Sequence, residues 1–280
     1  MNLSKFFSLL KAPSKSKFYY IERFLATPKL NVWKTLYVNF RAFGIKDALK
    51  FPILIYGPFK IYALGTIKLD IPTIRRGIIR IGRTNIKTYT KTKINNRGTI
   101  VFRGACHIWG GAYLELGRHA TLELGAHTLL GENVRILLQE YCRIGPYARI
   151  AFDTLFMDSD FHYMVHVDSG EIRNCHAPII IGACNWIGNK TTVKKGTVTP
   201  DYTIVAAPNA MLNKDYTAIT SAYPILGGSP AKEIAHGWRR IFSNSAQNDL
   251  TEFFQSGDHI YRLDLAQTDI DSYCTNNVIP

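Results

Sequence analysis

Apolar residues recur at every sixth position through the middle of this chain, and that period constrains its fold more than any other feature. Several of these positions are followed directly by glycine or alanine. The series are Leu124, Leu130, Ile136 and Cys142, then, after a two-residue slip, Ile144, Ile150 and Phe156, and later Ile181, Ile187, Val193, Thr199, Val205 and Met211.

A six-residue period has a direct structural interpretation. An extended chain that turns a corner every six residues closes a triangular coil after three turns, with one aliphatic side chain pointing inward from each side. Stacked coils bury a continuous core that no single coil can form alone, and glycine permits the tight corners. Ordinary antiparallel β structure is the alternative, because a period of two also places apolar residues six apart. It does not explain why glycine or alanine recurs in phase.

The texture of the sequence divides the chain into three regions. Residues 1–65 mix aromatic and basic residues with prolines, and we expect a capping or docking region of short pieces there. Residues 66–230 carry the period and are expected to form one β domain. The repeat fails over residues 157–177, so these should leave the coils as a loop. Helical periodicity returns at about Ala231, and residues 231–280 are expected to form a helix and a tail.

Positive charge is concentrated at the start of the chain. The whole chain has 34 Lys and Arg against 21 Asp and Glu, a net charge of +13. Residues 1–90 contain 17 basic and three acidic side chains, which leaves the rest near neutral. This region either closes the first coil as a solvated cap or attaches weakly to an anionic membrane surface. Nucleic acid binding is disfavoured, because no recognition module accompanies the charge.

A cytoplasmic protein is expected, peripheral at the inner face of the membrane if the N-terminal region binds lipid. The apolar stretch at residues 51–65 is interrupted by Pro52, Pro58 and Lys60 and is shorter than the roughly 20 residues of a spanning helix. The first residues lack a secretory pattern. Five widely spaced cysteines without a C-x-x-C pair indicate neither a disulfide framework nor a thiolate zinc site.

Three motifs resemble the hexapeptide-repeat acyltransferases. They are I-G-A-C-N-W-I-G ending at Gly188, G-G-S-P-A-K ending at Lys232, and D-S-D-F-H ending at His162, which is similar to the loop of the sugar O-acetyltransferase members. The resemblance covers residues 98–235 and implies a left-handed parallel β-helix, a homotrimer and acetyl-CoA as acyl donor. Thr199-Pro200 and the segment from Ala206 to Asn209 depart from the family pattern, so the coil that receives the pantetheine arm is atypical.

The extruded loop holds the expected catalytic residues. Acyl transfer to a hydroxyl needs a base, and an imidazole suits neutral pH. We expect His162 to be that base, with Asp160 or Asp158 either orienting its ring or only capping the loop. The resemblance points to Asn133 as an acceptor-orienting residue, although asparagine is also common at corners.

The expected cofactor site follows the later coils. The resemblance assigns the backbone N–H of Asn189 to the oxyanion of the tetrahedral intermediate, and Trp186 is either a packing residue or a wall of the acyl site. Lys214 and Lys232 are candidates for the phosphates of coenzyme A. The remaining candidates along the cofactor are Gly188, Ala206, Ala207, Gly228, Ser229 and Pro230.

These residues predict an acetyl-CoA-dependent O-acetyltransferase that acts on a sugar hydroxyl, in the synthesis of a surface polysaccharide or lipopolysaccharide. No metal is expected to be required. One alternative is a metalloenzyme of the γ-carbonic anhydrase type on the same fold, for which His162 and His166 are the nearest pair of ligands. The other is a non-catalytic β-helix scaffold.

Overall fold

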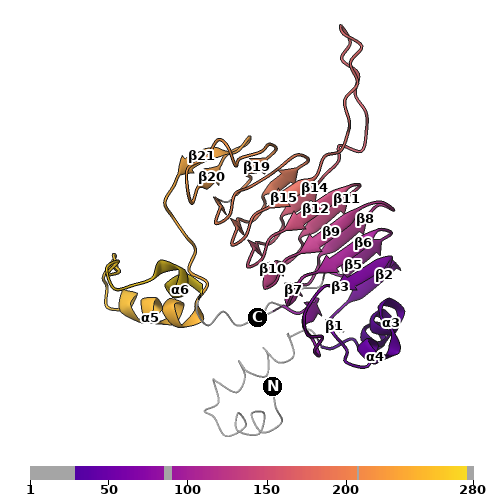
Figure 1. The fold of residues 1–280 in the computed structure, drawn as a ribbon, viewed down its shortest axis with the longest axis horizontal. Coiled ribbons are helices and arrows are strands. Elements are labelled where there is room, and N and C mark those ends of the chain that lie inside the picture. Colours follow the sequence, from indigo (N-terminus) through magenta and orange to yellow (C-terminus); the bar gives the residue numbers. More distant parts are fainter. Residues whose placement is uncertain (1–28, 85–89, 207, 276–280) are drawn as a thin grey trace, which may run out of the picture.

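The chain folds as a left-handed parallel β-helix with three flat sides (Figure 1). The period predicted the stacked triangular coils, and the left hand is the one that the resemblance implied. The computed structural model describes residues 29–84, 90–206 and 208–275. Up to β15 each coil contributes one strand to each of three sheets, and later strands join only the nine-stranded and seven-stranded sheets. Equivalent strands of successive coils pair in parallel. The predicted membrane-binding residues before Lys29 lie outside the described residues.

The strands are short, as triangular coils require. The nine-stranded sheet holds β1 (Ile53–Ile55), β4 (Ile79–Ile81), β7 (Cys106–Ile108), β10 (Thr128–Leu130), β13 (Arg149–Ile150), β16 (Trp186–Ile187), β18 (Ile204–Val205), β20 (Ile225–Gly227) and β21 (Lys232–Ala235). The seven-stranded sheet holds β2 (Phe59–Ala63), β5 (Thr92–Asn96), β8 (Tyr113–Leu116), β11 (Arg135–Leu138), β14 (Leu155–Met157), β17 (Thr192–Lys194) and β19 (Met211–Leu212). The five-stranded sheet holds β3 (Thr66–Leu69), β6 (Thr99–Phe102), β9 (Thr121–Leu124), β12 (Tyr141–Ile144) and β15 (Ile179–Ile181).

The predicted inward positions form the core, with one exception. From Leu124 to Val205 every residue of the series is buried. Met211 is only partly buried, and its neighbour Leu212 points inward instead. The corner between β18 and β19 is long enough to shift the phase by one residue, so a strict six-residue count fails there.

The glycines that follow inward residues are needed for close stacking of the coils. A Cβ added at Gly145 would lie 2.5 Å from the carbonyl oxygen of Gly182, and one at Gly182 would lie 2.6 Å from Pro200. Neither glycine has a positive φ. The constraint at these corners is therefore the approach of the next coil, rather than the backbone conformation that we expected glycine to permit.

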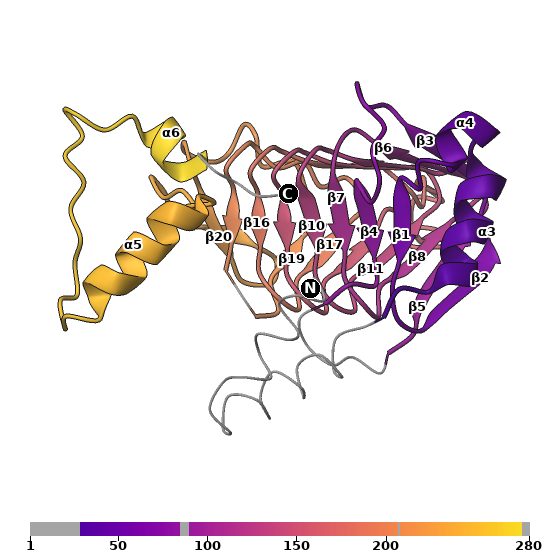
Figure 2. The same cartoon turned by 90° about the horizontal axis from the view of Figure 1, so that it is seen from below.

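The two ends of the β-helix are covered by different elements (Figure 2). At the first coil, α3 (Val32–Ala42) and α4 (Ile45–Ala48) form the cap. The side chain of Asn39 bonds both the N–H and the carbonyl of Ile53, and Thr35 Oγ1 accepts from the N–H of Ile55 at 3.1 Å. These bonds satisfy an exposed strand edge that would otherwise invite pairing with another chain.

Two boundaries differ from the sequence prediction. The parallel ladder begins with β1 at Ile53, which pairs with β4, so the expected start at residue 66 is too late. We did not expect strands in residues 51–65 because prolines interrupt them, yet β1 and β2 form there in the first coil. At the other end, residues 232–235 form the antiparallel strand β21, and the helices α5 (Asn244–Phe254) and α6 (Ile270–Thr275) come later than the predicted Ala231. Within the described residues, no helix is long and apolar enough to cross a membrane.

Candidate active site

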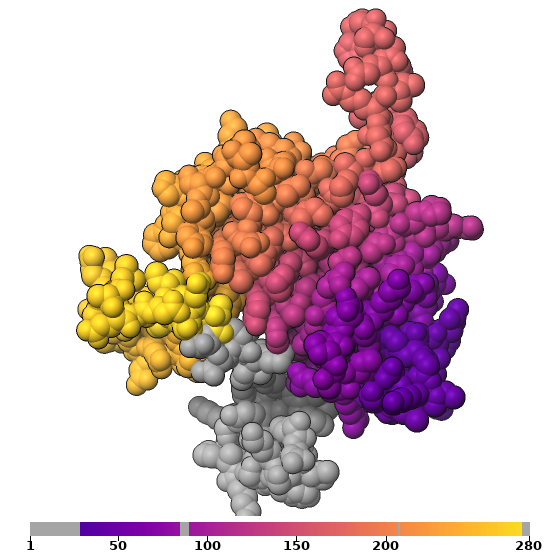
Figure 3. Space-filling model, viewed as in Figure 1, coloured from indigo at the N-terminus to yellow at the C-terminus, as the bar shows by residue number. Residues whose placement is uncertain are grey.

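Residues 158–178, which we call the hairpin, leave the coils between β14 and β15 and project far from the body (Figures 1 and 3). Antiparallel bridges join Ser159 to His176 and Val165 to Ile172. The hairpin starts at edge B, the row of corners that joins the seven-stranded to the five-stranded sheet. The opposite border of the seven-stranded sheet, where it meets the nine-stranded sheet, is edge A.

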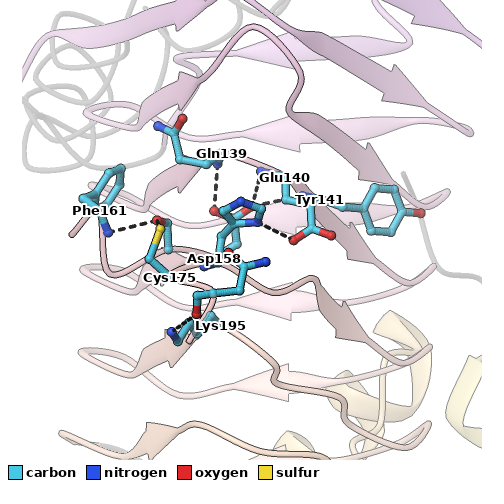
Figure 4. Close-up of polar contacts among 10 residues, drawn as sticks. Gln139, Glu140, Tyr141, Asp158, Phe161, Cys175 and Lys195 are labelled. Atoms are coloured by element: carbon cyan, nitrogen blue, oxygen red, sulfur yellow. Dashed lines mark hydrogen bonds and ion pairs between the residues drawn. The ribbon is translucent and has the colours of Figure 1, made fainter. Parts of the chain in front are cut away.

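Asp158 fixes the base of the hairpin to the preceding coil (Figure 4). Its buried carboxylate accepts backbone N–H bonds from Gln139, Glu140 and Tyr141 at 2.7, 2.8 and 2.9 Å. Burial raises the pKa of Asp158, and the three N–H donors oppose that shift. Its oxygens are therefore engaged by the corner of the coil, which is the capping role and not the predicted orienting role.

Asp160 is held by two lysines of the following coil. Its carboxylate lies 2.7 Å from Lys195 Nζ and 3.2 Å from Lys194 Nζ. The hydrogen bond from Lys195, together with that from Lys194, lowers the pKa of Asp160 below its ordinary value. Asp160 thus ties the hairpin to β17 and its corner, and it forms no hydrogen bond with His162 in the described residues. Of the two roles expected for Asp160, its lysine contacts fit the loop-capping one better than the orienting one.

His162 is exposed at the root of the hairpin. It lines a cavity of about 580 Å³ together with Asp160, His166, Asn174 and Lys195. In the part of the chain that the structure describes, no hydrogen bond involves its ring. The imidazole is therefore available to a ligand or to a neighbouring molecule, which is the first requirement for a general base.

His176 is the histidine of the hairpin with a carboxylate partner. Its Nδ1 lies 2.8 Å from Glu140 Oε2, across the joint between hairpin and coil. It lines a second cavity of about 600 Å³ with His119 and Tyr163. Sequence reasoning gave His176 no motif, because its partner lies 36 residues away and only the fold brings the two together.

Asn133 lies at edge A, far along the coil from the hairpin. Its φ of +55° is the left-handed conformation that asparagine tolerates at corners. A Cβ at Gly111 would come within 2.0 Å of Asn133 Oδ1, which shows how tightly the side chain is packed. Its Oδ1 is buried without a hydrogen-bond partner in the described ranges. The corner-residue interpretation fits this environment better than contact with an acceptor beside His162.

Asn189 also lies at edge A, next to Trp186 of β16. The N–H of Gly188 bonds Val205 and that of Lys190 bonds Phe152, whereas no described residue accepts from the N–H of Asn189. Trp186 is 41% exposed on the nine-stranded sheet, with the Arg240 guanidinium 4.7 Å from its ring centroid. A backbone amide that no described residue accepts from can donate to an oxyanion.

The other predicted cofactor residues are spread over both edges. Ala206 and the exposed turn of Gly228, Ser229 and Pro230 follow strands of the nine-stranded sheet and lie at edge A, where Ala206 bonds Leu226. Lys232 is exposed in β21. Lys214 is exposed at edge B, so it does not join the others, while Ala207 lies outside the described residues.

The predicted site residues therefore lie at two separate borders of the seven-stranded sheet, edge A and edge B. Four residues of β11 already span roughly 13 Å between the edges. The base candidate His162 at edge B and the amide donor Asn189 at edge A cannot meet within one chain. This separation is compatible with the expected homotrimer, in which the loop of residues 157–177 would reach across to a neighbouring β-helix, and that shared site stays a prediction.

The described residues offer few groups for metal binding or for catalysis by a thiol. Among the residues that the structure describes, no three His, Cys, Asp or Glu side chains gather as metal ligands. That leaves the metalloenzyme alternative without a ligand set in those residues. The five cysteines are free and buried, and burial raises the pKa of Cys142 and Cys184, which is the opposite of an activated nucleophile.

Solved structures with a similar fold include the polysialic acid O-acetyltransferase OatWY, with 21% identity over 70% of this chain and 95% of that one and a TM-score of 0.42. The polysialic-acid-specific acetyltransferase NeuO matches 76% of this chain and 91% of its own with 15% identity and a TM-score of 0.41. A hexapeptide-repeat acetyltransferase from Vibrio cholerae O1 biovar eltor, in complex with acetyl coenzyme A, matches 45% of this chain and 64% of its own with 24% identity and a TM-score of 0.36. These likenesses concern the fold alone.

No protein-family profile matches the chain, and no curated protein matches its sequence.

Proposed function

We propose that the protein is an acetyl-CoA-dependent O-acetyltransferase that acts on a sugar hydroxyl of a surface polysaccharide or lipopolysaccharide precursor. The observation that carries this proposal is the placement of a free imidazole and a free backbone amide on the two borders of the same sheet. Acyl transfer uses a base that removes the proton from the attacking hydroxyl and an N–H donor near the oxygen of the thioester carbonyl.

A homotrimer brings the two edges together. If the seven-stranded sheets of three copies face a common axis, edge B of each chain meets edge A of the next. Apolar side chains on the outer face of this sheet support the arrangement, namely Leu137, Leu155, Met157 and Met211. The hairpin also exposes apolar side chains that a neighbour would cover, including Met164 at 70% and Val167 at 88%.

Direct transfer is the proposed mechanism. His162 of one chain removes the proton from the sugar hydroxyl while the hydroxyl oxygen attacks the thioester carbonyl. The N–H of Asn189 of the next chain donates to the developing oxyanion. Collapse of the tetrahedral intermediate expels the thiolate of coenzyme A, which takes up the proton from the imidazolium. Trp186 would form a wall of this site, and Lys214 and Lys232 remain candidates for the phosphates.

Mixed trimers test both the chemistry and the shared site. The assay is release of free thiol from acetyl-CoA with a panel of sugar acceptors. Chains with His162→Ala and chains with Trp186→Ala should each be impaired alone. When the two are unfolded and reassembled one to one, a mixed trimer has one intact His162–Trp186 pair, so about a quarter of the wild-type activity should return.

Two outcomes would contradict the proposal. If the mixture recovers nothing while both variants remain trimeric, the site is not shared between chains. If a metal chelator, or His166→Ala as the matched hairpin control, abolishes activity as completely as His162→Ala does, the metalloenzyme alternative is the correct one.

A further inference from the structure

The outer face of the nine-stranded sheet carries a straight row of side chains, one from each coil. The register pairs Arg80 with His107, His107 with Leu129, Leu129 with Arg149, and Arg149 with Trp186. Successive strands are about 4.8 Å apart, so Arg80 and Arg149 are roughly 14 Å apart along the axis of the β-helix. Figure 2 views this sheet face on. We call these five residues, with the flanking Arg75, Arg83 and Arg240, the arginine row.

The arginine row contains no carboxylate. In the described ranges, none of its five arginines forms an ion pair with Asp or Glu. The five-stranded sheet differs, because its Arg103 pairs with both Asp70 and Glu123. One carboxylate lies nearby, because Glu132 bonds Thr84, which lines the same cavity as Arg80 and Arg83. Arginines without an ion-pair partner can still bind an anion from elsewhere.

The geometry of the guanidinium groups leaves donors for a ligand. The Nε–H of Arg80 donates a hydrogen bond to the carbonyl of Gly77 at 3.1 Å, and one terminal N–H of Arg149 donates to the carbonyl of His127. These bonds hold the side chains in place without using all five N–H donors of either group. Burial, then the fields of Arg80, Arg83 and Arg149, lower the pKa of His107 to about 4. At neutral pH two neutral positions, His107 and Leu129, therefore separate Arg80 from Arg149 along the row.

The row also offers surfaces for sugar rings. Trp109 and Leu129 line a cavity of about 210 Å³ with Arg80, Arg83 and His107. At the other end of the row, Trp186 is partly exposed, with the Arg240 guanidinium over its ring, and it precedes Asn189 of the proposed site by three residues. The flat apolar face of a pyranose can pack against such side chains while its carboxylate meets an arginine.

We propose that the arginine row binds a linear, carboxylate-bearing polysaccharide and guides this acceptor toward Trp186. The inference rests on the proposed sugar acetyltransferase function and names its substrate class. One sugar of an extended glycan advances by about the rise of one coil, so acidic sugars can meet the row in register. In the proposed trimer the seven-stranded sheet faces the axis, so the neighbouring chains do not cover the nine-stranded sheet. The chain's own Phe242 packs against Arg149, and Arg240 packs against Trp186, so the open part of the row is the end at Arg80 and His107.

Binding of oligogalacturonate, measured without acetyl-CoA, tests directly whether the arginine row binds a carboxylate-bearing polysaccharide. Fluorescently labelled chains of four or more sugars should bind the full-length protein, whereas the monomer and carboxyl-reduced chains of the same length should not. Arg80→Gln and Arg83→Gln should each weaken binding about tenfold, because each removes a charge-assisted bond. The matched control is Arg143→Gln, an exposed arginine on the outer face of the five-stranded sheet, which should bind like the wild type.

Several results would overturn the inference. Equal binding of the carboxyl-reduced chains would remove the role of charge, and an equal loss in Arg143→Gln would remove the role of the row. Tighter binding of single-stranded DNA or of phosphatidylserine vesicles, lost in Arg83→Gln, would assign the row to another class of partner. Failure of thiol release with every sugar would remove the proposed function and leave the binding result standing, so the two failures can be told apart.

Discussion

The coils and the hairpin are built on opposite physical principles. In the coils, each inward residue such as Ile187 is fully buried, and its backbone pairs with the coils on either side. In the hairpin, every residue from Phe161 to Asn174 is exposed, and two isolated bridges join its arms. The coils therefore supply stability, and the hairpin supplies groups that are free to meet another molecule.

This contrast explains how one chain serves two purposes. Repeat coils tolerate an insertion at a corner, because the neighbouring coils still pair across it, as β12 pairs with β15 beside the hairpin. The cost of ordering the hairpin is limited to its base, where Asp158 and Asp160 attach it to two successive coils. Substitutions in the two regions should therefore separate activity from stability.

The largest expected effect is on catalysis and comes from the hairpin. His162→Ala should reduce thiol release from acetyl-CoA by roughly 10²-fold to 10⁴-fold, the range for a positioned general base. Because the side chain is exposed, the thermal unfolding temperature should stay within experimental scatter of the wild type. If activity is unchanged, the base lies elsewhere, and His176 with its Glu140 partner is the next residue to replace.

The reverse pattern is expected in the core. Ile187→Ala removes buried methyl groups and opens a cavity, which should lower the free energy of unfolding by about 2 to 5 kcal/mol. Asp168→Ala, an exposed hairpin position, should change it by less than about 0.5 kcal/mol. Denaturant unfolding measures both. Similar losses at the two positions would contradict the division between coils and hairpin.

Acid should destabilise the coils through His107. Its pKa falls from 6.5 unfolded to about 4 folded, chiefly because of burial. The unfolded chain therefore binds more protons between these values, and stability falls as the pH drops from about 6.5 to 4, by up to about 3 kcal/mol. His107→Gln should flatten this part of the stability curve, while His119→Gln, at an exposed corner, should leave it unchanged.

The smallest effect is expected at the base of the hairpin. Asp160→Asn removes a partly exposed pair of lysine contacts and should cost less than about 1 kcal/mol. Because the folded pKa of Asp160 is lowered, its stabilisation is present above about pH 4 and is lost as the pH falls through the folded value. Faster proteolysis within the hairpin, with no change in global unfolding, would distinguish this local effect. Unchanged proteolysis would show that Asp160 does not anchor the hairpin.

The sequence by itself determined the repeat architecture of this protein. Burial of one side chain per six residues is a local requirement, so it appears in the order of Leu124, Leu130 and Ile136 without any knowledge of their partners. The same is true of the hairpin, which shows as a failure of the period. The six-residue count did not predict the one-residue shift from Met211 to Leu212, because the length of a corner leaves no periodic signal in the sequence.

Only the tertiary structure decided where the chemical groups lie relative to one another. Motif similarity singled out His162, Asn133 and Asn189, but it did not show that Asn133 and Asn189 lie at one edge of the β-helix while His162 lies in the hairpin at another. The partners of Asp160 and His176, which are Lys195 and Glu140, are likewise set by the stacking of coils. Contacts between coils depend on the number of residues in each corner and on the close approach of backbones at positions such as Gly145, and neither can be read from a local pattern.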